Sequence, residues 1–274
     1  MFFMDIPLGR WFIITIIFMA PFSVAAQDDA VELNYMYQNI DTDGATQETP
    51  VWRGFVGGSV RVVKTAIGKN IISLGPRAAV SYRDTVYWQV THGGVWLVKS
   101  DDRRARAGLA VKLRGGYDPD NAARLAGMEE RDTSLEAGIK ALWVSRPLTA
   151  SVAYYTDVSD TSNGDSASVN LSYQFLATDH LSIAPSLGAE WQSTEVIGYY
   201  YGVRPNEVTA GRPAYAGKST INLHVSITAH YRWTPHWSFF GGGSYTRLGT
   251  GMTDSPVVIR NGVPALYAGI NWRF

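Results

Sequence analysis

The sequence predicts an all-β protein, a transmembrane antiparallel up-and-down β-barrel of about twelve strands, with about ten as the alternative. Three observations predict it. From Trp52 onward, segments of about ten residues alternate between apolar and polar side chains. The connections between these segments are alternately short and long. The chain ends on ALYAGINWRF, in which apolar and aromatic residues occupy one strand face up to the last position.

The N-terminal residues predict export. Arg10 precedes the apolar stretch of residues 11–20, and small residues follow up to Ala26. This order is typical of a secretory signal peptide. The apolar core has about half of the roughly 20 residues that a membrane-spanning helix needs, which argues against a retained anchor. Residues 1–26 are therefore expected to be cleaved.

Residues 27–50 differ in composition from the rest of the exported chain. They are polar and acidic, and we expect a flexible N-terminal segment. The stretch VELNYMY within it has the alternation of one short strand. Residues 51–274 are then expected to form the barrel itself.

The clearest predicted strand covers residues 221–233. Every odd position there is apolar or aromatic and every even position is polar, so a slip of one residue would invert both faces. Similar alternation marks residues 167–175, 181–192, 104–114 and 135–143. Weaker alternation marks residues 52–64, 71–83, 86–99, 148–155 and 237–247. With the C-terminal segment these make eleven strands, and because bacterial single-chain barrels have an even number, we expect twelve.

The connections separate into two classes. Residues 145–147, 177–180 and 234–236 form short turns, and residues 118–132, 157–165, 193–217 and 250–264 form long loops. Short periplasmic turns and long extracellular loops are typical of outer-membrane barrels, as are aromatic residues at strand ends. A large soluble β-sandwich also alternates, but its strands are usually of about five or six residues and its loops are not graded by side.

Charged and imidazole side chains on the polar strand faces are expected to face the lumen. They are Arg106, Lys112, Arg114, Glu136, Lys140, Glu190, His224, His230 and Arg232. They could line a narrow channel and set its selectivity, or pair with one another and close it. About eight strands leave a filled interior and about sixteen an aqueous channel, so the expected strand number leaves both possibilities open.

Composition excludes several other functions. The net charge is zero, which argues against a nucleic-acid partner, and the absence of cysteine excludes thiolate chemistry. Ser226 and His230 lie on one strand face but about 13 Å apart, too far for a catalytic pair. No metal-ligand spacing is found, so no catalytic residue, cofactor or metal is expected. His92 falls on the apolar face of its segment without an evident reason.

The second half of the chain carries a family resemblance in three motifs. They are Tyr199, Tyr200, Tyr201, Gly202 and Val203; then Tyr245, Thr246, Arg247 and Leu248; then Asp254, Ser255 and Pro256. In this order and spacing they resemble the MipA/OmpV family, the MltA-interacting proteins. The similarity is good over residues 132–274, looser over 52–116 and absent over 27–50. The tyrosine motif could be a docking surface or a packed loop, and the Asp-Ser-Pro motif has the composition of a turn.

The resemblance implies a location and a role. It implies a bacterial outer-membrane barrel and, for the founding member, a scaffold that joins a murein lytic transglycosylase to a penicillin-binding protein. Other members are linked to adhesion, osmotic response or antibiotic susceptibility. The C-terminal residues resemble the signal that the barrel-assembly machinery recognises in its clients: Tyr267, Gly269, Trp272 and Phe274. The expected function is a non-enzymatic scaffold; the alternatives are a narrow channel for small polar solutes and an adhesin acting through residues 193–217.

Overall fold

The computed structural model describes residues 51–274 of the chain. The predicted signal peptide and the segment of residues 27–50 lie outside the described residues. In the described part, no helix is both long and apolar enough to cross a membrane.

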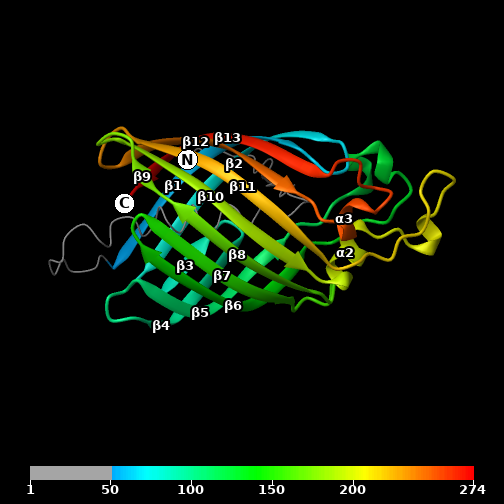
Figure 1. The fold of residues 1–274 in the computed structure, drawn as a ribbon, viewed down its shortest axis with the longest axis horizontal. Helices are drawn as coiled ribbons and strands as arrows, with labels where there is room; N and C mark the ends of the chain where they lie inside the picture. Colours follow the sequence, from blue (N-terminus) through cyan, green and yellow to red (C-terminus); the bar gives the residue numbers. More distant parts are fainter. Residues whose placement is uncertain (1–50) are drawn as a thin grey trace, which may run out of the picture.

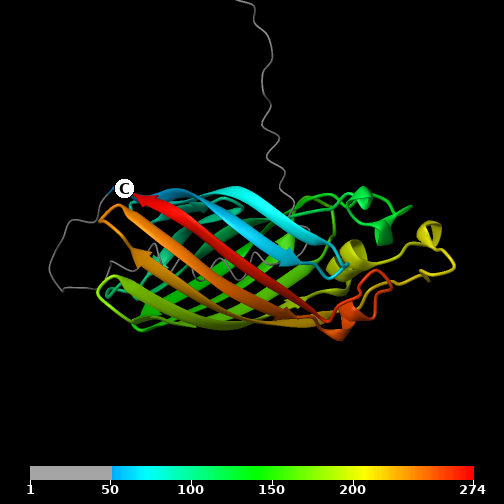
Figure 2. The same cartoon turned by 90° about the horizontal axis from the view of Figure 1, so that it is seen from above.

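One antiparallel sheet runs around the molecule and closes on itself (Figures 1 and 2). Its thirteen strand segments close where β10 pairs with β11. Segments β8 and β9 are one strand interrupted at Gln174, so the barrel has twelve strands. The predicted fold class and strand number are confirmed.

The structure gives the following strand bounds. They are β1 (Trp52–Lys64), β2 (Asn70–Tyr82), β3 (Val86–Gln89), β4 (His92–Lys99), β5 (Ala105–Arg114), β6 (Ser134–Ser145), β7 (Leu148–Asp157), β8 (Asp165–Tyr173), β9 (Phe175–Leu176), β10 (Leu181–Gln192), β11 (Thr220–Arg232), β12 (Trp237–Arg247) and β13 (Gly262–Arg273).

One predicted strand was wrong. Residues 86–99 form a hairpin of two strands, β3 and β4, and this division supplies the twelfth strand. The turn between them contains Val90 and Thr91, and no glycine, proline, asparagine or aspartate marks it in the sequence. The turn also resets the alternation, because Gln89 and His92 pair directly across it and share the inward face. This places His92 inside the barrel, where it is buried.

The two ends of the barrel differ (Figure 1). The C-terminus lies at one end, and the helices α2 (Thr194–Tyr201) and α3 (Thr250–Thr253) lie at the other. Gly54 and Phe274 exchange backbone hydrogen bonds, so both ends of the described chain lie together. The three predicted short turns share this end with the turns at residues 83–85 and 100–104, which were not predicted, whereas the 65–69 turn lies at the opposite end. By the general rule for bacterial barrels, the end with the C-terminus is the periplasmic end.

The two faces of each strand meet different solvents. On β11, Ile221, Leu223, Val225 and Ile227 are 52–56% exposed, whereas the alternate side chains are buried in the lumen. A water-soluble protein would bury the apolar face and expose the polar one. The inverted arrangement fits an apolar solvent around the barrel.

A charge on the outer face should therefore destabilise the barrel. We expect Ile227→Arg, near the middle of β11, to lower the free energy of unfolding by about 2 to 4 kcal/mol, because arginine would lie in hydrocarbon. Urea unfolding of the protein in lipid vesicles measures this change. Val208→Arg, at a 46% exposed loop position, is the control and should change the value by less than about 0.5 kcal/mol. Equal effects of the two substitutions would contradict a lipid-facing β11.

Candidate functional site

A network of paired charges fills part of the lumen. The carboxylate of Glu136 on β6 accepts hydrogen bonds from the guanidinium of Arg114 on β5 and lies 3.0 Å from the ammonium of Lys112. Glu190 on β10 lies 3.5 Å from Arg114 and 3.9 Å from Lys112. The two cations and two anions balance, and the four side chains are between 1% and 13% exposed. Such a network balances the charge on its section of the lumen wall instead of presenting one sign of charge to a passing ion.

Closer to the periplasmic end, the lumen is filled by apolar and aromatic side chains. Tyr87 and Trp96 stack with ring centroids 4.8 Å apart, and Phe55 belongs to the same buried cluster. Leu142 and Val144 complete it from β6, on the face that carries Glu136 nearer the other end. Sequence alone did not indicate this cluster. The alternation of β6 could have found part of it, because Leu142 and Val144 lie on the same inward face as Glu136.

The other predicted lumen residues are spread along the wall. Arg106 donates to Asp84 at 2.8 Å, and Lys140 lies 6.0 Å from the Tyr87 ring. His224 hydrogen-bonds Asn170 at 2.6 Å, and the His230 ring lies 6.0 Å from that of Phe240. All four predicted residues are buried. Arg106 also lies 5.9 Å from the Trp96 ring, so Arg106 and Lys140 meet the same stacked pair of rings, whereas His224 and His230 have other neighbours.

Arg232 does not lie in the lumen, which corrects the expectation. It is exposed at the end of β11 and donates a hydrogen bond to the carbonyl oxygen of Asp179 in the neighbouring turn. Its even number places it on the inward-facing side of the alternation, but β11 ends at this residue. Parity predicts a side chain's direction only where strands continue on both sides.

The loop end of the barrel is covered by a packed lid, which we define as residues 115–133, 193–219 and 248–261. Its core includes Leu125, Ile197, Met252 and Val257, each 1% exposed or less. Residues of all three loops and of the 65–69 turn contribute to this single cluster. The lid covers the mouth that a solute would use.

The tyrosine motif is part of this lid. Tyr200 and Tyr201 on α2 are buried, and Tyr199 packs against the cluster. The Tyr200 hydroxyl lies 3.2 Å from both the Ser134 hydroxyl and the Asp132 carbonyl oxygen, within hydrogen-bond distance of each, and burial raises the pKa of Tyr200 to about 12. Gly202 caps α2, and Val203 exchanges backbone hydrogen bonds with Tyr215. The motif therefore packs the loop over the barrel.

The Asp-Ser-Pro motif joins the lid loops to one another, and the motif of residues 245–248 leads from β12 into the lid. Asp254 ends α3, and the Ser255 hydroxyl donates to the Tyr201 carbonyl at 2.5 Å. The Arg124 guanidinium donates to the Pro256 carbonyl at 2.8 Å. On β12, Thr246 faces inward while Tyr245 and Arg247 are exposed, and Leu248 joins the lid core.

An ion pair between two loops lies at the centre of the lid. Arg131 donates to both carboxylate oxygens of Glu207 at 2.8 Å, and both side chains are 1% exposed. Burial alone would raise the pKa of Glu207, but the backbone N–H groups of Arg204 and Glu129 and the Arg131 guanidinium lower this pKa below its ordinary value. The two residues are far apart in sequence, so no local pattern predicts the pair.

The C-terminal residues divide between the two faces. The Tyr267 hydroxyl lies 2.6 Å from that of Thr228 inside the barrel, whereas Trp272 and Phe274 face outward. Gly269 has no room for a side chain, because a Cβ there would lie 2.4 Å from the Gly58 carbonyl oxygen. Recognition by the assembly machinery remains a prediction.

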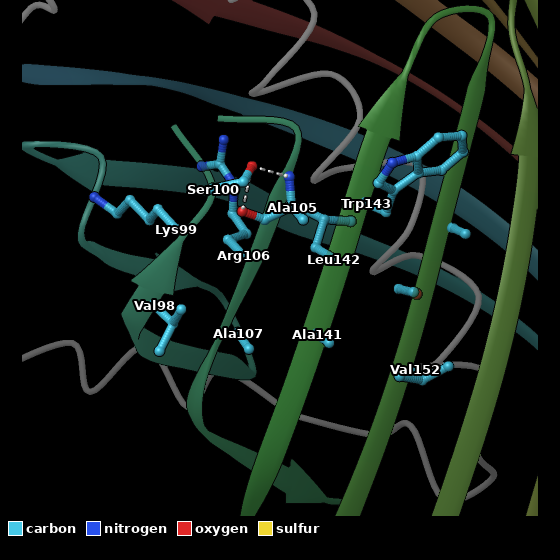
Figure 3. A pocket seen from close by; sticks show the side chains of 12 residues that line it. Val98, Lys99, Ser100, Ala105, Arg106, Ala107, Ala141, Leu142, Trp143 and Val152 are labelled. Atoms are coloured by element: carbon cyan, nitrogen blue, oxygen red, sulfur yellow. Dashed lines mark hydrogen bonds between the residues drawn. The ribbon is translucent and has the colours of Figure 1, made fainter. Parts of the chain in front are cut away.

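A groove runs along the outer wall of strands β4 to β7 (Figure 3). It is lined by small and apolar side chains, among them Ala105, Ala107, Ala141 and Val152, which point away from the lumen. Because it lies on the lipid-facing side, it is no passage through the barrel.

A comparison of the sequence with known protein families agrees with the motifs noted above. Residues 56–274 match the family described as MltA-interacting protein MipA. The chain belongs to the MipA family. The protein is thus an outer-membrane barrel, as its relatives are named outer membrane proteins.

Individual MipA-family relatives are distant. Outer membrane protein Omp26La of Vibrio anguillarum is 29% identical over 52% of this chain and 55% of its own, and OmpV of Vibrio cholerae is 28% identical over the same shares. The chain thus matches about half the length of these two. The MltA-interacting protein of Escherichia coli is 23% identical over 80% of this chain and 89% of its own. A KdgM porin structure covers 82% of this chain and 99% of its own, at 10% identity and a TM-score of 0.37.

Breaking the lid ion pair should loosen the loops. We expect Glu207→Gln to destabilise the lid locally by about 3 to 5 kcal/mol, because Arg131 would stay buried without its counter-ion. The rate at which a protease cleaves residues 193–219 in the folded barrel measures this, and Glu195→Gln, at an exposed position on α2, is the control. Because the pKa of Glu207 is lowered on folding, the wild-type lid should keep its resistance above the unfolded pKa of about 4.3 and lose it at lower pH. Equal cleavage of both variants at neutral pH would contradict this role.

Proposed function

We propose that this MipA-family barrel is a non-enzymatic scaffold that docks peptidoglycan-remodelling enzymes at the inner face of the outer membrane. The observation that carries the proposal is the filled lumen under a packed lid. The name of the Escherichia coli relative, an MltA-interacting protein, supports interaction with a murein enzyme. A lytic transglycosylase and a penicillin-binding protein are the proposed partners.

The periplasmic turns are the proposed docking surface. They form the rim at which the described chain begins and ends. The turn of residues 100–104 presents Arg104 and Asp102, with side chains 51% and 59% exposed. Exposed charges at such a rim would steer a partner and set its orientation.

Two observations weigh against the alternatives. A channel for polar solutes needs a continuous path, whereas the Arg114–Glu136 network and the Tyr87–Trp96 cluster occupy two levels of the lumen. An adhesin acting through the tyrosine motif needs accessible rings, whereas Tyr200 and Tyr201 are buried in the lid. Discrete conductance steps that change in Arg114→Gln or Lys140→Gln would favour the channel instead.

A capture experiment tests the scaffold. The refolded barrel is immobilised beside an unrelated barrel, and a purified lytic transglycosylase and penicillin-binding protein from the same cell are applied. We expect selective binding, weakened at least fivefold by Arg83→Glu combined with Arg104→Glu, because these reverse charge on two periplasmic turns.

Lys218→Glu provides the matched control for these variants. Its side chain is 72% exposed at the loop end, so reversing its charge should leave partner binding unchanged. Binding no stronger than to the unrelated barrel would overturn the scaffold proposal. Equal weakening by Lys218→Glu would overturn the assignment to the periplasmic turns.

A further inference from the structure

The barrel wall is incomplete beside β2. This strand pairs with β1 along its whole length, but in the described residues it pairs with β3 only at residues 79–82. The β3–β4 hairpin turns back at Val90 and Thr91, so residues 70–78 of β2 have no described strand on their second side. This open edge lies in the half of the wall nearer the lid.

The exposure of its side chains agrees that no described strand covers this edge. Ile72 and Leu74 are 74% and 84% exposed, compared with 52–56% for lipid-facing residues on β11, which has a strand on each side. A Cβ added at Gly75, on the inward face of β2, would meet no heavy atom of the described residues within 4 Å. The outward side chains of β2 are therefore more open here than those of β11, and the inward face is open at Gly75.

The orientation of the backbone shows what the edge requires. The N–H of Arg83 donates to the Val51 carbonyl, and the Tyr82 carbonyl accepts from the N–H of Thr85. The backbone groups of odd-numbered residues of β2 therefore face β1, and those of even-numbered residues face away from it. Ile72 and Leu74 therefore direct both N–H and C=O groups toward the gap. Pro76, at another even position, has no N–H to leave unpaired, as is usual for proline on an edge strand. In hydrocarbon each unpaired group costs several kcal/mol, so the edge calls for a hydrogen-bonding occupant.

A peptide strand fits this edge better than the other candidates. A lipid acyl chain has neither donors nor acceptors. Two copies inserted in the same direction are related by rotation about the membrane normal. Their two β2 strands would then run in the same direction across the membrane, but the strand tilt would make them cross at an angle. This crossing prevents pairing over residues 70–78.

We propose that residues 31–37 of this chain add to the open edge of β2 as a β-strand. In VELNYMY the residues Val31, Leu33, Tyr35 and Tyr37 alternate with Glu32, Asn34 and Met36. The first set would continue the lipid-facing surface of Ile72 and Leu74, and the second would face the lumen. Added strands of this kind gain main-chain hydrogen bonds along the edge.

The reach of the chain is sufficient. Val51 lies level with Arg83, just beyond the end of β2. Along β2, the open edge begins about 13 Å and ends about 40 Å from Tyr82. Residues 38–50 can span up to about 43 Å when extended. The tether also raises the effective concentration of the segment to the millimolar range.

The charges are complementary. Residues 27–50 contain six acidic and no basic residues, which leaves residues 51–274 with an excess of six basic residues. On the inner wall beside the gap, Arg61 on β1 and Arg77 on β2 occupy inward positions. Strands β13, β1 and β2 contain no aspartate or glutamate at all. Glu32 would enter a positive environment there.

Cysteine cross-linking tests the proposal, because the chain has no cysteine of its own. In the full chain, folded in isolated outer membranes, Leu74→Cys is combined in turn with Val31→Cys, Leu33→Cys and Tyr35→Cys. After mild oxidation we expect at least one pair to form an intramolecular disulfide in most molecules. Ile72→Cys repeats the series if Leu74→Cys fails to give heat-modifiable gel mobility.

Leu266→Cys is the control. Its side chain is 66% exposed to lipid, but β13 has a strand on each side, so less than a tenth of the molecules should cross-link to the segment. Absence of a disulfide in every β2 pair, or equal yields with Leu266→Cys, would overturn the proposal. A disulfide-linked dimer of the single variant Leu74→Cys would overturn it in favour of a second copy on this edge.

Discussion

The structure depends on one constraint, the pairing of backbone N–H and C=O groups where no water can replace a lost partner. Twelve strands close into a ring and satisfy it over most of the wall, and the edge of β2 at residues 70–78 is the exception among the described residues. The hydrogen bonds between Gly54 and Phe274 show how far the closure extends, because they join the first described strand to the last residue of the chain.

A closed barrel has an interior that side chains can fill. In this chain, different groups of side chains occupy different heights along the lumen. Aromatic and aliphatic side chains around Tyr87 and Trp96 occupy one level, and the Arg114–Glu136 network another. Above them, the lid is held by an apolar core and by the Arg131–Glu207 pair. These side chains weigh against an open passage, which is why we propose a function at the periplasmic rim.

The sequence predicted what depends on local alternation and missed what depends on distant contacts. The strand of residues 221–233 was specified by its own pattern and is observed as β11. The β3–β4 hairpin was missed because Val90 and Thr91 carry no turn signal. Arg232 was misplaced because parity says nothing about where a strand ends. The Arg131–Glu207 pair joins two loops, and only the closed barrel brings them together. The family motifs were recognised in sequence, but their packing role in the lid was visible only in the structure.

The open edge of β2 is the part of the described wall where the pairing constraint is not met by a described strand. The most direct test is residue-resolved amide hydrogen exchange on the full chain in lipid bilayers, comparing Ile72 and Leu74 with Leu223 on the doubly paired β11. If every strand group in the membrane is paired, the amides of Ile72 and Leu74 exchange as slowly as that of Leu223. Exchange as fast as that of the exposed loop residue Val208 would show that the wall tolerates an unpaired edge, and would contradict the constraint on which this description of the barrel rests.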